Sequence, residues 1–263
     1  KKLAKYLKNV DRCIIGSEKL DSRILNNQKK LKIICRYGTN TENIDSNTCK
    51  KNKIKVLKLK KNINSQAVAR QSLALLLNIT NNLYFYSKIS KNNFWKRKKN
   101  LSPEIIKVGI IGMGSIGIIF ARYLKLLKFK VNYYSRNKKK INYIKHYNSI
   151  KKLIKNSDII SIHLPSNSDT KKLFSEKIFK MLKGKILINT SRGDLFDEKI
   201  FYKYLKNRYI KFAALDVFQN EPTINISKKI RLLPNVISTC HSSFYDEETI
   251  KKMVFETLKK VTR

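Results

Sequence analysis

Short apolar runs alternate with longer segments of helical periodicity along almost the whole chain. Between the runs, segments such as Ile118–Leu127 and Glu198–Lys206 carry apolar residues three or four positions apart. Strands that alternate with helices form βαβ units and parallel sheets, and strands covered by helices on both faces are apolar throughout. The pattern predicts an α/β fold with a doubly wound parallel sheet. The predicted strands are Arg12–Ile15, Leu31–Cys35, Ile54–Leu59, Val108–Ile111, Val131–Tyr134, Asp158–Leu164, Lys185–Asn189, Ala213–Val217 and Val236–Thr239.

A division of the chain is predicted near residue 65. The segment Ser65–Ser90 lacks glycine and proline and has apolar residues at helical spacing, which predicts one long linking helix. The polar, basic segment Lys91–Pro103 after it is interpreted as a surface connection. We therefore expect a larger domain at 66–242. A smaller domain would consist of 1–65, completed by the C-terminal segment 243–263 with its predicted helix.

The charge of the chain allows two interpretations. Lys and Arg number 58 against 18 Asp and Glu, for a formal net charge of +40. Such a charge attracts polyanions, so a nucleic-acid binder is one alternative. The other is a compositional drift toward Lys, Asn and Ile. The lysines are spread along the chain rather than gathered in one basic helix, so we favour drift and expect no specific nucleic-acid partner.

Two classes of protein are not favoured by the sequence. No apolar run reaches the roughly 18 residues of a membrane span, and no signal peptide opens the chain. The four cysteines, Cys13, Cys35, Cys49 and Cys240, are far apart and form no CxxC pair. We therefore expect no membrane association, no metal site and no disulfide framework, and the cysteine usage fits a reducing, cytoplasmic compartment.

The most informative motif is a G-x-G-x-x-G run between a predicted strand and a predicted helix. Gly112 allows the tight turn, Gly114 lets a pyrophosphate approach the backbone, and Gly117 lets the helix pack closely. The helix N-terminus at Ser115 and Ile116 offers free N–H groups to phosphates. In this context the motif predicts dinucleotide binding by the domain at 66–242.

The end of the following strand bears on the choice of dinucleotide. An NAD site places an acidic residue there against the ribose 2′-hydroxyl, whereas this chain has Ser135 and Arg136. A hydroxyl and a guanidinium suit a 2′-phosphate, so the cofactor is predicted as NAD(P), with NADP slightly favoured. The alternative is that Arg136 is one more basic residue of a basic chain.

Further polar residues follow the later strands. In an open parallel sheet, ligands bind outside the carboxyl ends of the strands, so these segments should face the same crevice as the glycine motif. We predict cofactor contacts from Leu164, Pro165, Thr190 and Asp216. The segments concerned are His163–Pro165, Asn189–Asp194, Leu215–Pro222 and Thr239–Ser242.

Taken together, these motifs resemble the D-isomer-specific 2-hydroxyacid dehydrogenases, the family of phosphoglycerate, glyoxylate and D-lactate dehydrogenases. The motifs are the glycine run, Asn-Thr-Ser-Arg-Gly at 189–193, Ala-Leu-Asp-Val-Phe-x-x-Glu-Pro at 214–222, and His241. The resemblance covers about residues 11–249. It implies a homodimer, a substrate between the two domains, and a flavodoxin-like substrate domain. Two strands of that domain precede the equivalent of Arg12–Ile15, so we expect the N-terminal domain here to be truncated.

The resemblance also implies roles for individual residues. Arg192 would hold the substrate carboxylate and carbonyl, His241 would be the general acid/base, and Glu221 would pair with its imidazole. Asp216 would contact the nicotinamide carboxamide. The loop Gly38, Thr39 and Asn40 would bind the substrate carboxylate through backbone N–H groups.

These roles are chemically reasonable in themselves. Reduction of a 2-oxo acid needs a hydride, which nicotinamide supplies, and a proton for the developing alkoxide. An imidazolium such as that of His241 can give the proton, and the Glu221 carboxylate favours its charged form. The planar guanidinium of Arg192 suits two oxygens at once. Of the other histidines, His146 is interpreted as exposed and His163 as lining the cofactor pocket.

The chain also departs from the family pattern. Asn40 replaces a glycine of the carboxylate loop, Arg70 replaces a glutamate of the linking helix, and Cys240 replaces the proline before the histidine. The segment 241–245 lacks the usual glycines and is more similar to the branch of the C-terminal-binding co-repressors. A dinucleotide-sensing interaction protein is therefore an alternative, but intact Arg192, Glu221 and His241 favour an enzyme acting on a small 2-oxo or 2-hydroxy acid.

Overall fold

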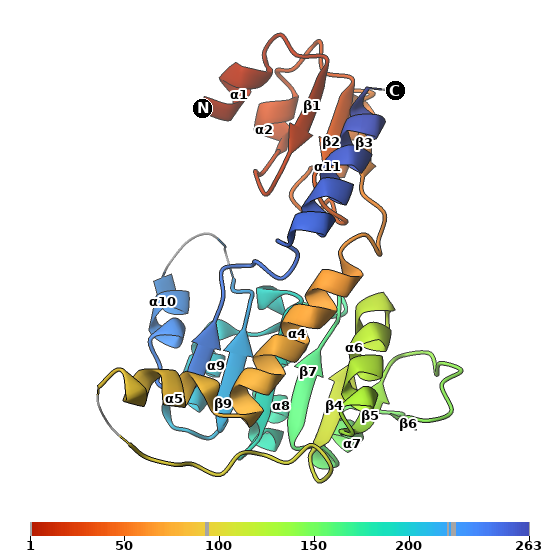
Figure 1. Ribbon diagram of the computed structural model, residues 1–263. Helices are drawn as coiled ribbons and strands as arrows, with labels where there is room; N and C mark the ends of the chain where they lie inside the picture. The colour runs from red at the N-terminus through yellow and green to blue at the C-terminus, as the bar shows by residue number, and fades with distance from the viewer. Residues whose placement is uncertain (1, 93–94, 220, 222–224, 263) are drawn as a thin grey trace. The chain divides into compact units, whose positions relative to one another are not determined.

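The computed structural model describes residues 2–92, 95–219, 221 and 225–262. Its contacts divide the chain into two compact units (Figure 1). Unit 1 consists of Lys1–Asn64 and Phe244–Arg263, and unit 2 is the continuous segment Ser65–Ser243.

Unit 2 is built on a seven-stranded sheet in which every neighbouring pair of strands is parallel, in the order β10-β9-β8-β7-β4-β5-β6. Its strands are β4 (Lys107–Ile111), β5 (Lys130–Tyr134), β6 (Lys145–Tyr147), β7 (Ile159–Ile162), β8 (Ile186–Asn189), β9 (Phe212–Leu215) and β10 (Val236–Ser238). Its helices are α4 (Ser65–Thr80), α5 (Leu83–Ser90), α6 (Ser115–Leu126), α7 (Ile150–Lys155), α8 (Glu176–Met181), α9 (Glu198–Lys206) and α10 (Asn225–Arg231), with a short 3-10 turn η1 (Gly193–Leu195). The predicted α/β fold with a doubly wound parallel sheet is confirmed.

Two apolar cores lie on the two faces of this sheet. Helices α4 and α6 cover one face, where Leu76 and Phe120 are completely buried (Figure 1). Helices α7, α8 and α9 cover the other face, where Phe179 and Leu205 are completely buried. Strands β7 and β8 are buried at every position, as a strand between two helical layers must be.

The strand order locates the ligand edge of unit 2. The chain builds β4, β5 and β6 in one direction and then returns to β7, so the order reverses between β4 and β7. Strands β4 and β7 end side by side, with Ile111 opposite Ile162. In open α/β sheets, ligands bind at such a switch point beyond the carboxyl ends of the strands. The glycine motif follows β4 and the segment at 163–165 follows β7.

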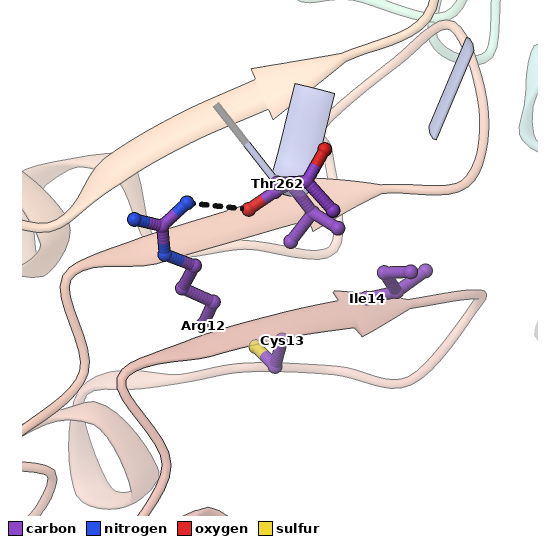
Figure 2. A pocket seen from close by; sticks show the side chains of 5 residues that line it. Arg12, Cys13, Ile14 and Thr262 are labelled. Atoms are coloured by element: carbon purple, nitrogen blue, oxygen red, sulfur yellow. Dashed lines mark hydrogen bonds between the residues drawn. The ribbon is translucent and has the colours of Figure 1, made fainter. Parts of the chain in front are cut away.

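Unit 1 has a three-stranded parallel sheet in the order β1-β2-β3. Its elements are α1 (Lys2–Leu7), β1 (Arg12–Ile15), α2 (Ser22–Leu25), β2 (Ile33–Arg36), α3 (Ser46–Lys51), β3 (Lys55–Lys58) and α11 (Glu247–Val261). Helix α11 packs on β1 and β2, and the Arg12 guanidinium donates a hydrogen bond of 2.7 Å to the Val261 carbonyl at its end (Figure 2). The early and late segments of the chain thus share one unit.

One prediction about secondary structure was wrong, and one strand was missed. The segment Ser65–Ser90 is not one helix, because Asn82 adopts left-handed backbone (φ 53°) between α4 and α5, and its amide group bonds to Lys99 and Asn100. The three-residue edge strand β6 was not predicted, since Lys145–Tyr147 is too short and polar to show a strand period. In the part of the chain that the structure describes, no helix is long and apolar enough to cross a membrane.

Candidate active site

The glycine motif forms a turn that only glycine allows at two of its positions. Gly112 has a φ of +100°, and a Cβ there would lie 2.4 Å from the carbonyl oxygen of His163. A Cβ on Gly117 would lie 2.2 Å from the carbonyl oxygen of Gly112. At Gly114 a Cβ would meet nothing within 4 Å. This open space is where a ligand can approach the backbone.

The first turn of α6 presents unbonded donors beside that space. Within the described residues, no acceptor bonds the backbone N–H groups of Ser115, Ile116 or Gly117. The Ser115 hydroxyl lies 2.8 Å from that of Ser65. A helix N-terminus with free N–H groups binds phosphate through hydrogen bonds and the helix dipole. The residues present therefore fit the pyrophosphate of a dinucleotide.

The end of β5 adjoins the glycine turn, because the Gly112 N–H donates to the Tyr134 carbonyl over 2.9 Å. Beyond it, the Ser135 hydroxyl donates to the carbonyl of Asn137 over 2.7 Å. The guanidinium of Arg136 lies 3.4 Å from the Asp169 carboxylate, and both side chains are exposed. These groups border the place where the ribose of a dinucleotide on the glycine turn would lie.

The three residues after β7 lie behind or beside the glycine turn. His163 is buried, its Nε2 lies 2.9 Å from the Ser161 hydroxyl, and its Nδ1 has no partner among the described residues. Burial lowers the pKa of His163 to about 3, so the ring is neutral. Leu164 is half-buried next to Gly112, and Pro165 is exposed.

The segment after β8 is held by its own side chains. The Asn189 amide donates to the Arg192 carbonyl over 2.8 Å, and its oxygen accepts bonds from the N–H and the hydroxyl of Ser191. Thr190 is buried, with its hydroxyl 2.8 Å from that of Ser72. Gly193 packs against the next segment, because a Cβ there would lie 2.0 Å from the carbonyl carbon of Phe218. This close packing explains the glycine after Arg192.

Glu221 and His241 form a directly bonded pair. The Nδ1 atom of His241 lies 2.5 Å from Oε2 of Glu221. The other oxygen, Oε1, accepts the backbone N–H of Phe218 at 2.5 Å. His241 has left-handed backbone (φ 51°), and its N–H donates to the Asp216 carbonyl over 2.8 Å. Asn220 and Pro222 of the same motif lie outside the described residues.

Asp216 anchors the loop that carries the histidine. Its side chain is completely buried, and its Oδ1 accepts the Thr239 hydroxyl and, at 2.9 Å, the N–H of Ser242. Its Oδ2 accepts the hydroxyl of Ser243 and, at 3.1 Å, the N–H of the same residue. The contact of Asp216 with a nicotinamide carboxamide stays a prediction, because its oxygens are engaged beneath the loop.

A polar pocket of about 320 Å³ in unit 2 brings the three predicted catalytic residues together. Arg192, Glu221 and His241 all line it, and neither Asp216 nor Thr190 does. The guanidinium of Arg192 donates to the carbonyl of Ser191 over 2.6 Å. The remaining lining residues are Lys171, Gly193, Asp194, Val217, Phe218 and Gln219. A planar cation and a carboxylate-bound imidazole in one pocket can bind an oxyacid and transfer a proton to it.

The predicted carboxylate loop lies in unit 1, directly after β2. Gly38 donates its N–H to the Arg36 carbonyl, and a Cβ on Gly38 would lie 2.4 Å from the Arg36 guanidinium. The backbone N–H groups of Thr39 and Asn40 have no acceptor among the residues the structure describes. These two donors can bind an anion through hydrogen bonds.

Sequence reasoning missed two residues of this region. Lys171 lines the pocket, and Glu198 is buried behind it at 3% exposure. Burial raises the pKa of Glu198, although hydrogen bonds from Gln219 and Ser227 oppose this. Its only sequence signal was an acidic residue in the first turn of a predicted helix, which is usually exposed. The prediction that His146 is exposed was also wrong: it is half-buried in β6 against the ring of Tyr133.

Other polar features of the described residues do not form a second centre. No group of three His, Cys, Asp or Glu residues among them is placed to hold a metal ion. A pocket of about 490 Å³ in unit 1 is lined by Arg12, Cys13, Ile14, Val261 and Thr262 (Figure 2). Burial raises the pKa of the Cys13 thiol to about 11, which keeps the thiol protonated and unreactive at neutral pH.

Comparisons with known proteins identify the family of the chain. The model of the D-isomer specific 2-hydroxyacid dehydrogenase NAD-binding domain matches residues 73–243. A hydroxypyruvate reductase of Thermotoga maritima is 31% identical over 98% of this chain and 86% of its own length.

Solved structures share the whole fold. A D-lactate dehydrogenase from Aquifex aeolicus, complexed with NAD and lactic acid, superposes with a TM-score of 0.89 at 26% identity, covering 98% of this chain and 84% of that one. An acyclic imino acid reductase in complex with NADPH and D-Arg superposes with a TM-score of 0.85 at 27% identity, covering 99% and 84%. The chain belongs to the D-isomer-specific 2-hydroxyacid dehydrogenase family of NAD(P)-dependent oxidoreductases.

Proposed function

We propose that this chain reduces a small 2-oxo acid to the D-2-hydroxy acid, with His241 as proton donor, Glu221 as its partner and Arg192 as substrate clamp. The observation that carries the proposal is the 2.5 Å contact between His241 and Glu221 in a pocket that Arg192 also lines. The hydroxypyruvate reductase and D-lactate dehydrogenase named above act on substrates of this class.

The residues of the pocket divide the reaction between them. Arg192 holds the carboxylate and carbonyl oxygens, and so polarises the carbonyl. Bound NAD(P)H supplies the hydride that adds to C2. The carbonyl π electrons move to oxygen, and Nε2 of His241 gives the oxygen its proton. Glu221, bonded to Nδ1, stabilises the imidazolium before that transfer and fixes the orientation of the ring.

Two further assignments extend this proposal. The glycine turn and the first turn of α6 would hold the dinucleotide phosphates, because their N–H groups and the open space at Gly114 are suited to an anion. The loop at Thr39 and Asn40 would bind the substrate carboxylate through its unbonded N–H groups. Unit 1 would then serve as the substrate domain.

The acid/base assignment is tested by replacing His241 with glutamine. His241→Gln should lower kcat for glyoxylate, pyruvate or hydroxypyruvate reduction by about 100-fold or more, with NADPH binding unchanged. Glu221→Gln should move the alkaline decline of kcat to lower pH, because the imidazolium loses its anionic partner. Cys240→Ala is the matched control, since this exposed neighbour of His241 does not line the pocket. Near-normal turnover by His241→Gln would rule the assignment out.

We also propose a preference for NADPH over NADH. Arg136 can form charge-assisted bonds to a 2′-phosphate, and an exposed arginine at this place should favour NADPH about tenfold. Asp169 holds that guanidinium and would repel the phosphate, so Asp169→Asn should tighten NADPH binding further.

The cofactor preference is measured as two dissociation constants by nicotinamide fluorescence. Arg136→Ala should bring the NADPH and NADH constants together, whereas Arg122→Ala, which removes an exposed charge elsewhere in unit 2, should not. Ser135→Asp should reverse the preference, because an aspartate repels the phosphate and accepts bonds from a free ribose diol. Equal constants in the unchanged protein contradict the proposal.

A further inference from the structure

Behind the pocket, a buried carboxylate holds the backbone of the turn that carries Glu221. Glu198 is the first residue of α9 and is 3% exposed. Its Oε1 accepts the backbone N–H of Gln219 at 2.6 Å, and its Oε2 accepts the hydroxyl of Ser227 at 2.8 Å. One carboxylate therefore bonds α9 to the turn after β9 and to α10.

Gln219 is two residues from Glu221, and Phe218 and Gln219 are themselves fixed at several points. The amide of Gln219 donates to the carbonyl of Phe196 over 2.7 Å. The N–H of Phe218 bonds to Oε1 of Glu221, and the backbone of Phe218 packs against Gly193. Apart from the bond between Phe218 and Glu221, these contacts come from the segment 193–198, which directly follows Arg192.

A buried charge of this kind is not required for packing alone. Burying a carboxylate carries a desolvation penalty, and well-packed apolar residues often give equal or greater stability. The charged groups that face Glu198 are Glu221, which repels its negative charge, and Arg231, which favours it. Burial and Glu221 thus disfavour the charge of Glu198, and the bonds from Gln219 and Ser227 together with Arg231 offset this only in part.

We propose that Glu198 is a positioning residue: it fixes the backbone at Gln219 so that the Glu221 carboxylate meets Nδ1 of His241. The inference rests on the proposed acid/base role of the pair. Glu198 does not line the pocket, so a hydrogen bond made outside the pocket sets the geometry of the pair.

The test compares two substitutions of Glu198 with a matched control. Glu198→Ala removes both bonds, and we expect kcat to fall by about 10- to 100-fold, the usual scale when a catalytic group is misplaced by about 1 Å. The alkaline decline of kcat should move to lower pH, as in Glu221→Gln. Glu198→Gln keeps an acceptor for Gln219 and a donor to Ser227, and should retain kcat within about fivefold.

Glu176→Ala is the control for loss of a carboxylate near α9. Glu176 is exposed and accepts the hydroxyl of Tyr204 at 3.2 Å, away from the turn. The substitution Glu176→Ala should leave both kcat and its pH profile unchanged. The dissociation constant of NADPH, measured by fluorescence, should be unchanged in all three variants, which separates a moved turn from a damaged domain.

If Glu198→Ala does not fold, Ser227→Ala replaces it, because it removes only one of the two bonds. We then expect a smaller shift of the pH profile in the same direction. The inference is overturned if the pH profile of kcat is unshifted in Glu198→Ala. If that variant does not fold, an unshifted profile in Ser227→Ala overturns it. An active His241→Gln variant would instead overturn the proposed function, so the two failures are distinguishable.

Discussion

The glycine turn at 112–117 and the segments that carry Glu221 and His241 are fixed by different forces. In the turn, backbone packs on backbone: positions 112 and 117 have no room for a Cβ. In the acid/base segments, two buried carboxylates, Asp216 and Glu198, hold the backbone through hydrogen bonds. One region depends on shape and the other on polar partners.

This difference implies different sensitivities. A steric turn tolerates changes in charge but not an added methyl group. A loop held by buried carboxylates loses its geometry when an acceptor is removed, because donors that are buried or partly buried are left unbonded. Substitutions that remove an acceptor in one region, or add a methyl group in the other, test this difference.

The largest effect is expected from Asp216→Ala. It removes the acceptor of the N–H groups of Ser242 and Ser243 and of two hydroxyl groups, at a completely buried position. Each unsatisfied group that is buried costs about 1–3 kcal/mol, and the N–H and the hydroxyl of Ser243 are both buried, so the free energy of unfolding should fall by about 2–6 kcal/mol. Denaturant unfolding followed by circular dichroism measures it. A loss below about 1 kcal/mol would show that contacts other than those of Asp216 hold the loop.

A smaller effect on the free energy of unfolding is expected in the glycine turn, where positions 112 and 114 should differ. Gly112→Ala should lower the free energy of unfolding by about 2–3 kcal/mol, because an alanine at φ +100° is strained and its Cβ meets the His163 carbonyl. Gly114→Ala should leave stability within about 0.5 kcal/mol, since its Cβ enters open space. It should nevertheless weaken dinucleotide binding. Equal effects of the two substitutions on stability would contradict the steric interpretation.

The same contrast explains what the sequence could predict. The glycine turn and the apolar strands are local patterns, so their place and the fold of unit 2 could be read directly. Glu198 could not be found, because its burial depends on Gln219 and Ser227, which are distant in sequence. The break at Asn82 depends likewise on bonds to Lys99 and Asn100.

Motif resemblance identified three residues of the pocket but not the residues that hold them in place. Arg192, Glu221 and His241 line one pocket, as the combined motifs predicted they would meet. Asp216 was predicted as a cofactor contact, and only the structure places its carboxylate beneath the histidine loop. Neither position nor residue type distinguishes these two uses of an aspartate in a sequence.

The smallest expected effect concerns His163, which joins the two regions in one residue: its carbonyl packs on the glycine turn and its ring is a buried polar group. Burial lowers the pKa of the ring from the ordinary value of 6.5 to about 3. Above pH 6.5 the ring is neutral in both the folded and the unfolded chain. Between pH 6.5 and 3 only the unfolded chain takes up the proton, so stability falls as the pH falls. The loss should reach about 2 kcal/mol at pH 5.

His163→Gln cannot take up the proton and keeps a donor for Ser161, so its unfolding free energy should depend less on pH between 7 and 5 by that amount. If His163→Gln leaves the pH dependence of the unfolding free energy unchanged, the ring is protonated in the folded protein at pH 5. The glycine turn would then pack against a charged histidine.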